Sequence, residues 1–167
     1  MRFSREGPTA ADILNSYDEH AIELIIRGFG EERNSKNIAK AIVEKRREKP
    51  FEKTSDLLRI FRPKSFRDRI HPATRTFQAL RIAVNDELTA LEEGIAKGFE
   101  LLNYGGRIAV ISFHSLEDRM VKNFFRDLAK TGEATLITKK PITPSEEELK
   151  ENPRARSAKL RIIEKNG

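Results

Sequence analysis

The segment "ISFHSLEDR", residues 111–119, gathers the polar side chains of this sequence that are best suited to do chemistry. The imidazole of His114 and the hydroxyls of Ser112 and Ser115 follow directly on an apolar run. A chain that only needed to turn would more often carry Gly, Asn or Pro here. Histidine can accept a proton, and the free N–H groups of a helix start can bind a phosphate or a polar base. The alternative is that these residues merely cap the helix that follows.

The elements around this segment indicate an α/β arrangement. "RIAVISF", residues 107–113, is largely apolar, which predicts a strand buried on both faces, as in a parallel sheet. Ser115 and Asp118 fit a capping box that starts a helix, and further strands are predicted at 134–138 and 158–165. In such sheets ligands bind outside the carboxyl ends of the strands. Three strands are too few to form the buried core of a doubly wound sheet. We therefore expect that further strands come from outside this chain or that its α/β part is unusually small.

The first part of the chain is predicted to be a small helical bundle. Apolar residues recur there at three- and four-residue steps. Thr9 and Asp18 are suited to cap helices, and Ser35 and Thr54 open two more. A polar, basic loop from Arg62 to His71 predicts a boundary. We therefore expect a helical substrate-recognition domain over residues 1–68 and an α/β domain over residues 69–167.

A long amphipathic helix is predicted after this boundary. Its apolar stripe runs from residue 77 to residue 102 in steps of three or four, with Gly94 and Gly98 inside it as points where it could break. A polar ridge runs along the same helix and consists of Arg75, Gln78, Arg81 and Asn85. Such side chains can donate hydrogen bonds to the phosphates and base edges of RNA. The alternative is a solvated face on which Arg81 pairs with Asp86.

Two further groups of basic residues suit an acidic partner, and the formal net charge of the chain is +6. Arg154 and Arg156 precede the last strand. They would point the same way in an extended chain, where both could contact one run of phosphates. The alternative is that they protect a sheet edge. Arg62, Lys64 and Arg67 belong to the basic loop and could follow an RNA backbone.

Several classes of function are disfavoured. The chain has no Cys, which excludes disulfides and cysteine zinc sites, and its three His lack the spacing of a metal site. It has neither the nucleophile elbow of a serine hydrolase nor a glycine-rich loop after a strand. No apolar run is long enough for a membrane span, and the first residues do not resemble a signal peptide. We therefore expect no metal, no membrane and a cytoplasmic location.

Three stretches together resemble one family: "HPATRTFQALRIAVNDEL", "LLNYGGRIAVISFHSLEDRMVKNFF" and "ENPRARSAKLRIIEK". They are similar to the RsmH (MraW) family, which comprises S-adenosylmethionine-dependent methyltransferases of the N4 amino group of a cytosine in 16S ribosomal RNA. The resemblance covers nearly the whole chain but only the later part of the family's length. It implies a partial class I, Rossmann-like methyltransferase sheet preceded by a small helical recognition domain.

The resemblance also implies roles for individual residues. His114, Ser112 and Asn152 would be catalytic, and our hypothesis for the proton acceptor is His114. The predicted RNA-binding residues are Arg75, Gln78, Asn85, Ser115, Arg154 and Arg156 by the resemblance, and Arg81, Arg62, Lys64 and Arg67 by their charge and spacing alone. No residue is assigned to the cofactor S-adenosylmethionine, because its site is expected in the missing N-terminal part.

We therefore expect the chain to be a fragment, a split gene product or a sequence with a mis-called start, inactive on its own. Its partner would be 16S rRNA or the small ribosomal subunit, with self-association or a complementing N-terminal half. The alternative is a non-catalytic RNA-binding fragment that lacks the cofactor site. A helical DNA-binding protein is disfavoured, because no helix–turn–helix spacing is evident among the first helices.

Overall fold

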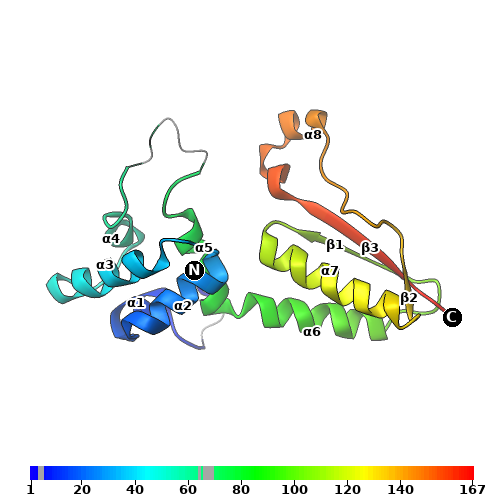
Figure 1. Cartoon of the computed structure of the whole chain (residues 1–167), viewed down its shortest axis with the longest axis horizontal. Coiled ribbons are helices and arrows are strands. Elements are labelled where there is room, and N and C mark those ends of the chain that lie inside the picture. Colours follow the sequence, from blue (N-terminus) through cyan, green and yellow to red (C-terminus); the bar gives the residue numbers. More distant parts are fainter. Residues whose placement is uncertain (4–5, 64, 66–69) are drawn as a thin grey trace. The chain divides into compact units, whose positions relative to one another are not determined.

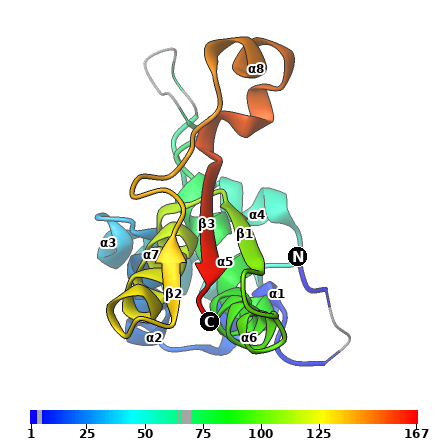
Figure 2. The same ribbon diagram turned by 90° about the vertical axis from the view of Figure 1, so that its right-hand side faces the viewer.

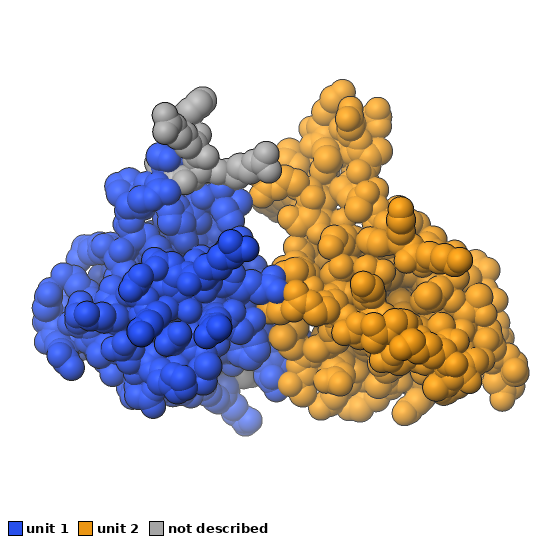
Figure 3. All heavy atoms as spheres, viewed as in Figure 1, with its two compact units in different colours: residues 1–87 blue, residues 88–167 orange. Residues whose placement is uncertain are grey.

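The computed structural model of the protein, drawn in Figure 1, describes residues 1–3, 6–63, 65 and 70–167. It consists of two compact units, residues 1–87 and residues 88–167, which Figure 3 shows in different colours. The domain boundary predicted at residues 68 and 69 falls outside the described residues and stays a prediction. Among the described residues, no helix is both long and apolar enough to cross a membrane.

All the secondary-structure elements described in residues 1–86 are helices. These are α1 (Ala10–Ser16), α2 (Glu19–Gly30), α3 (Ser35–Glu48), α4 (Thr54–Leu58) and α5 (Thr74–Asn85). The predicted caps of the first two helices are confirmed: the side chain of Thr9 accepts from the Asp12 N–H, and that of Asp18 accepts from the Ala21 N–H. The Thr9 N–H in turn donates to the Asp12 carboxylate at 2.8 Å, which completes a capping box.

One apolar cluster holds the helices of unit 1 together. Its eleven buried members are Ile13, Leu14, Ile22, Ile26, Ile38, Ala39, Ile42, Phe51, Leu57, Leu80 and Val84. Helices α2 and α5 approach closely at Gly30, where an added Cβ would lie 2.7 Å from the Arg75 carbonyl oxygen. A side chain at that position would force the two helices apart. The prediction of a small helical bundle is therefore confirmed.

The single helix predicted over residues 77–102 is wrong. Two helices, α5 and α6 (Glu87–Glu100), are separated by Asp86, whose φ of 47° lies in the left-handed region. Aspartate tolerates that conformation better than most residues, because its short polar side chain can bond locally. The Asn85 amide also donates to the Arg81 carbonyl oxygen at 2.8 Å, in competition with a continuing helix. Neither Gly94 nor Gly98 interrupts α6.

Unit 2 contains a sheet of three strands, β1 (Arg107–Ser112), β2 (Ala134–Leu136) and β3 (Lys159–Lys165). β3 lies between the other two and is antiparallel to both, as can be followed in Figure 2. The prediction of a parallel sheet is therefore wrong for the pairs that form, although β1 and β2 run in the same direction. Helix α7 (Ser115–Lys130) connects them. The connection to β3 contains α8 (Glu146–Glu151) and a 3₁₀ turn, η1 (Pro153–Ser157).

Helices α6 and α7 cover the same face of this sheet (Figures 1 and 2). Phe99 of α6 and Phe125 of α7 pack with Ile163 of β3 in one buried cluster. The Lys165 ammonium closes the end of α6, because it donates to the carbonyl oxygens of Phe99, Glu100 and Leu102 at distances of 2.9 to 3.1 Å.

The prediction that residues 107–113 are buried on both faces is wrong for this chain. Along β1 the side chains alternate between exposed and partly or fully buried, and the exposed ones are those of Arg107, Ala109 and Ile111. The inward positions include Ile108 and Val110, which pack against the cluster beneath α7. An apolar strand can thus be covered on one face only, since alternation in burial comes from the pleat and not from the residue types.

Candidate functional site

The turn between β1 and α7 brings together three of the residues predicted to carry chemistry. His114 is the N-cap of α7, and its Nδ1 accepts a hydrogen bond from the Glu117 N–H at 3.3 Å. The Glu117 carboxylate in return accepts from the N–H groups of Phe113 and His114, at 2.8 and 3.3 Å. The capping box is therefore His114–Glu117, one residue earlier than the predicted Ser115–Asp118 pair.

The bond at Nδ1 determines which nitrogen of His114 carries hydrogen. Because Nδ1 accepts, the neutral imidazole has its hydrogen on Nε2. That atom is buried and lies 3.2 Å from Glu117 Oε1 in a poorly aligned contact, so it has no hydrogen-bond partner among the described residues. In this arrangement His114 is a donor at Nε2. It can accept a proton only at Nδ1, once the cap bond has opened.

Glu117 fixes this turn as a carboxylate. Burial alone would raise the pKa of its carboxyl group, but the adjacent His114 side chain and the hydrogen bond from the Phe113 N–H outweigh it and lower the pKa. The group is therefore ionised at neutral pH and holds the backbone of Phe113 and His114.

The two serines of the turn differ in their surroundings. Ser112 is buried, and its hydroxyl donates to the Lys159 carbonyl oxygen of β3 at 3.4 Å. Ser115 is exposed as the first residue of α7. Between them, the Phe113 side chain is 55% exposed at the carboxyl end of β1. The turn thus presents the aromatic ring of Phe113 to solvent and keeps the Ser112 hydroxyl inside.

Asp118 has a role that the sequence analysis missed. It is buried, and its two carboxylate oxygens accept from Arg161 at 2.7 Å and from Lys159 at 2.9 Å, both on β3. Burial alone would raise the pKa of the Asp118 carboxyl group, but these two cations outweigh it and lower the pKa. The sequence contains one signal for this role: Lys159 and Arg161 lie two residues apart and so share the inward face of a strand. Buried cations need an acidic partner, which Asp118 provides.

The arrangement of Arg154 and Arg156 differs from the extended one predicted. Both lie in the 3₁₀ turn η1, where they are exposed and take part in no ion pair among the described residues. Proline at the first position of η1 favours this turn. Asn152 is exposed just before it, and its carbonyl oxygen accepts from the Ala155 N–H at 3.0 Å.

The polar ridge of α5 is engaged within unit 1. The Arg75 guanidinium donates to the Glu31 carbonyl oxygen at 3.3 Å, and the Gln78 amide donates to the Phe29 carbonyl oxygen at 3.2 Å. Both bonds reach carbonyl groups at the end of α2, which have no partner inside their own helix. Arg75 and Gln78 therefore tie α5 to α2, whatever else they contact.

The second half of this ridge is also paired. Arg81 binds the Glu87 carboxylate through Nε and Nη2 at distances of 2.9 to 3.1 Å, so its partner is Glu87 and not the predicted Asp86. The Asn85 side chain accepts from the Phe3 N–H at 2.8 Å and donates to the Met1 carbonyl oxygen at 3.0 Å. Of the basic loop, Arg62 is exposed, while Lys64 and Arg67 lie outside the described residues.

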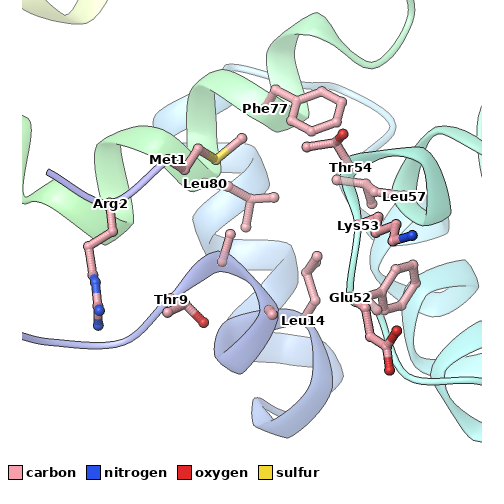
Figure 4. Close-up of a pocket in the computed structure, with 13 residues that line it drawn as sticks. Met1, Arg2, Thr9, Leu14, Glu52, Lys53, Thr54, Leu57, Phe77 and Leu80 are labelled. Atoms are coloured by element: carbon pink, nitrogen blue, oxygen red, sulfur yellow. The ribbon is translucent and has the colours of Figure 1, made fainter. Parts of the chain in front are cut away.

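A separate cavity of about 340 Å³ lies in unit 1 (Figure 4). Leu14 of α1, Leu57 of α4 and Phe77 of α5 line it from three helices, and Arg2 lies at its side. None of the residues predicted to be catalytic or to bind RNA lines it. The residues predicted to be catalytic belong instead to unit 2.

A sheet of three strands with a polar turn after its first strand is part of an α/β fold, here accompanied by a helical unit. The model of the MraW methylase family matches residues 1–166. The chain therefore belongs to the MraW methylase family.

Curated relatives carry a common name. A "Ribosomal RNA small subunit methyltransferase H" of Persephonella marina is 51% identical to this chain over 99% of the chain and 58% of its own length. Proteins of the same name from Coprothermobacter proteolyticus and Heliobacterium mobile are 50% and 51% identical, again over 99% of the chain but 56% and 59% of their own lengths. The chain thus spans somewhat more than half the length of the relatives that it matches.

Proposed function

We propose that this chain forms the recognition part and the C-terminal catalytic part of an rRNA methyltransferase. Its substrate would be the N4 amino group of a cytosine in 16S rRNA of the small ribosomal subunit, and its location the cytoplasm. The observation that carries the proposal is the family match over residues 1–166, together with the shared name of the relatives. The domain division at residues 68 and 69 belongs to the same proposal.

The methyl donor in this proposal is S-adenosylmethionine, and we infer that the two loops after β1 and β2 do not form a cradle for it. A backbone that approaches a nucleotide cofactor closely uses glycine after a strand. No glycine lies between β1 and α7 or between β2 and α8. The N–H groups of Phe113, His114 and Glu117 are already bonded within the turn. The chain would therefore supply the RNA side of the reaction and not the donor side.

The turn after β1 is suited to hold an acceptor base. Ring stacking on Phe113 and hydrogen bonding to Ser115 are contacts that single bases in RNA commonly make. Ser112 and His114 would hold the turn in place through their hydrogen bonds to β3 and to α7. Asn152, Arg154 and Arg156 would contribute from the loop before β3, where exposed guanidinium groups suit phosphates.

Methyl transfer in trans tests the proposal against its alternative, a non-catalytic RNA-binding fragment. The chain is incubated with small ribosomal subunits and radiolabelled S-adenosylmethionine, with and without the unmatched part of the Persephonella marina relative. We expect label in 16S rRNA only when both parts are present. Binding of RNA without label, under conditions in which the intact relative is active, would favour the alternative.

His114 can be tested against its structural role by two substitutions. His114→Asn keeps an acceptor for the Glu117 N–H, since asparagine is a good N-cap, whereas His114→Ala removes both cap and imidazole. If the imidazole takes part in the reaction, both variants lose turnover in the assembled protein and keep their affinity for RNA. Normal turnover in His114→Asn would limit His114 to capping.

The basic turn η1 can be tested by salt dependence. Replacing Arg154 and Arg156 by Ala should weaken RNA binding and lower the slope of log affinity against log salt by about 2, one for each phosphate that the double variant no longer neutralises. Lys150→Ala, on the neighbouring α8, is the matched control. An unchanged slope in the double variant would remove η1 from the RNA interface.

A further inference from the structure

Unit 2 contains a cavity of its own, the basic pocket, with a volume of about 220 Å³. Lys122 and Arg126 line it from α7, Lys139 lines it from the segment after β2, and Arg161 lines it from β3. β2 is an edge strand of the sheet, as Figure 2 shows. No acidic side chain among the described residues lines this pocket. The cavity in unit 1, by contrast, has Glu52 beside its cations.

The cations of the basic pocket are only partly neutralised. Arg126 Nε lies 3.1 Å from the Asp127 carboxylate, but this pair is exposed, and exposed pairs contribute little. Lys122 and Lys139 are exposed as well, and neither takes part in an ion pair with any residue that the structure describes. Because these two ammonium groups lack a counter-ion in the chain, the pocket attracts an anion from solution.

Arg161 brings a nearly buried guanidinium to the same pocket. Its side chain is 12% exposed, and its Nε donates to the Asp118 carboxylate at 2.7 Å. Within the described part of the chain, its two Nη groups make no hydrogen bond. Asp118 therefore holds the guanidinium in place without using all of its donors. A guanidinium fixed in this way is well suited to donate to the oxygen atoms of a phosphate.

Thr138 adds a hydroxyl group that lacks a partner. It lines the basic pocket, and its Oγ1 is buried and makes no hydrogen bond to any described residue. Proteins rarely bury a hydroxyl in this way, because the hydrogen bonds to water are lost without compensation. An oxygen atom of a ligand in the pocket would accept from this hydroxyl. Phe125 and Leu136 also line the pocket, and such apolar walls strengthen the field of the cations.

We propose that the basic pocket binds a phosphate group. The phosphate oxygens accept from the Thr138 hydroxyl and the Arg161 guanidinium, and the ammonium groups of Lys122 and Lys139 balance the charge. Donors from three segments suit a tetrahedral group with several oxygens better than a planar carboxylate. The pocket is also smaller than the roughly 300–1,000 Å³ of sites that hold whole small molecules, so it suits a single charged group.

A phosphate of this kind belongs either to an RNA backbone or to free phosphate. Both sources offer the same oxygen atoms to the same donors, so their chemistry in the pocket is shared and binding measurements separate them. The proposal does not rest on the proposed function, because neither the turn after β1 nor η1 lines the pocket.

Titration of the full chain with inorganic phosphate tests the site, at an ionic strength kept constant with chloride. Binding is followed by the NMR signals of the backbone amides near Thr138. Replacing both Lys122 and Lys139 by Gln should weaken phosphate binding about tenfold. Replacing Lys130 and Lys140 by Gln is the matched control, because it removes the same charge from α7 and from the segment after β2 without changing the lining. The control should bind phosphate with unchanged affinity.

Thr138→Val tests the hydroxyl separately, because valine keeps the shape of the side chain and removes the donor. It should weaken phosphate binding about fivefold, whereas Thr138→Ser should not. Without phosphate, Thr138→Val should melt at or above the temperature of the unchanged chain, since no hydrogen bond is lost. A lower melting temperature would show that the hydroxyl is already bonded within the protein, which contradicts the assignment.

A single-stranded RNA oligonucleotide distinguishes the two sources of phosphate. If the pocket holds a backbone phosphate, the Lys122 and Lys139 double variant lowers the slope of log RNA affinity against log salt by about 1, and inorganic phosphate competes with RNA. If only the affinity for inorganic phosphate differs between this variant and its control, the ligand is free phosphate. Equal affinities of all variants for both probes overturn the proposal. Methyl transfer that persists in that case leaves the proposed function intact.

Discussion

Units 1 and 2 have nearly the same length, but they bury their apolar residues very differently. Residues 1–87 contain a cluster of eleven buried residues, whereas residues 88–167 contain one of five. A helix has one apolar stripe, which a few neighbouring helices can cover. A sheet with two apolar faces needs two layers, and in unit 2 only one layer is present among the described residues. A helical segment can therefore be self-sufficient at a length at which an α/β segment is not.

The polar contacts of the two units differ in the same way. In unit 1 side chains bond to backbone, as in the pair of bonds that joins the Asn15 side chain to the backbone of Phe51, and the Arg81–Glu87 ion pair involves an exposed arginine. In unit 2 a buried Asp118 holds two cations of β3. Removal of one partner from such a group leaves the others buried without compensation. We expect unit 2 to be the more sensitive of the two to single changes of charge.

The largest expected effect is that of Asp118→Ala. It leaves the guanidinium of Arg161 buried without a partner, which should destabilise unit 2 by about 4 kcal/mol. Hydrogen exchange resolved along the chain measures this, with faster exchange in residues 88–167 and little change in 1–87. Asp127→Ala is the control on the same helix, because its ion pairs with Arg126 and Lys130 are exposed. An equal response to both variants would contradict the comparison.

Ile42→Ala should produce the opposite pattern. Ile42 is fully buried in the cluster of unit 1, and loss of its side chain should cost about 3 kcal/mol through transfer and cavity terms. Hydrogen exchange should then accelerate in residues 1–87 and not in 88–167. If unit 2 also loosened to the same extent, the units would not be independent in stability.

Acid should weaken unit 2 through Asp118. Lysine and arginine lower the pKa of this carboxyl group in the folded chain, so the unfolded chain binds the proton more readily. Its contribution to stability is complete above the ordinary pKa of about 3.9 and is lost as the pH falls through the lower folded value. The effect is smaller than that of Asp118→Ala, since a protonated carboxyl still fills the space. Hydrogen exchange of unit 2 against pH measures it, and Asp118→Asn should remove this component of the profile.

The smallest effect is expected at the start of α1. Thr9→Ala removes the acceptor for the Asp12 N–H and should cost about 1 kcal/mol, confined to the first turns of unit 1. Thr9→Ser keeps the hydroxyl and is the control. If Thr9→Ala abolished the cooperative melt of all of unit 1, the cap would stabilise more than the start of α1.

The sequence predicted features whose cause is local. The caps at Thr9 and Asp18 were predictable because each cap and its partner lie three residues apart. The stripe of α5 and α6 was predicted as well, but the break at Asp86 was not, because it depends on a left-handed backbone that aspartate only tolerates. The family resemblance came from long motifs and is confirmed by the match over residues 1–166.

The features that the sequence did not reveal depend on distant partners. The hydrogen bonds of Asp118 join residues that are 41 and 43 positions apart, and although Lys159 and Arg161 indicate that an acid is needed, no local pattern identifies Asp118 as that acid. The direction of β1 relative to its neighbour depends on β3, which enters the sheet between the other strands. For the candidate site, the residue types around His114 were evident, but its bond to Glu117 N–H, which restricts its chemistry, required the geometry of the turn.

The position of β3 has a consequence for the order in which the protein can mature during synthesis. β3 is made last of the three strands and yet lies between the other two, and its Lys165 also closes the end of α6. Neither ladder can form until β3 leaves the ribosome, so β1 stays unpaired for roughly 3 to 10 s of translation. Unit 1 needs none of these residues and can fold meanwhile. During synthesis, chaperones therefore have more time to act on unit 2 than on unit 1.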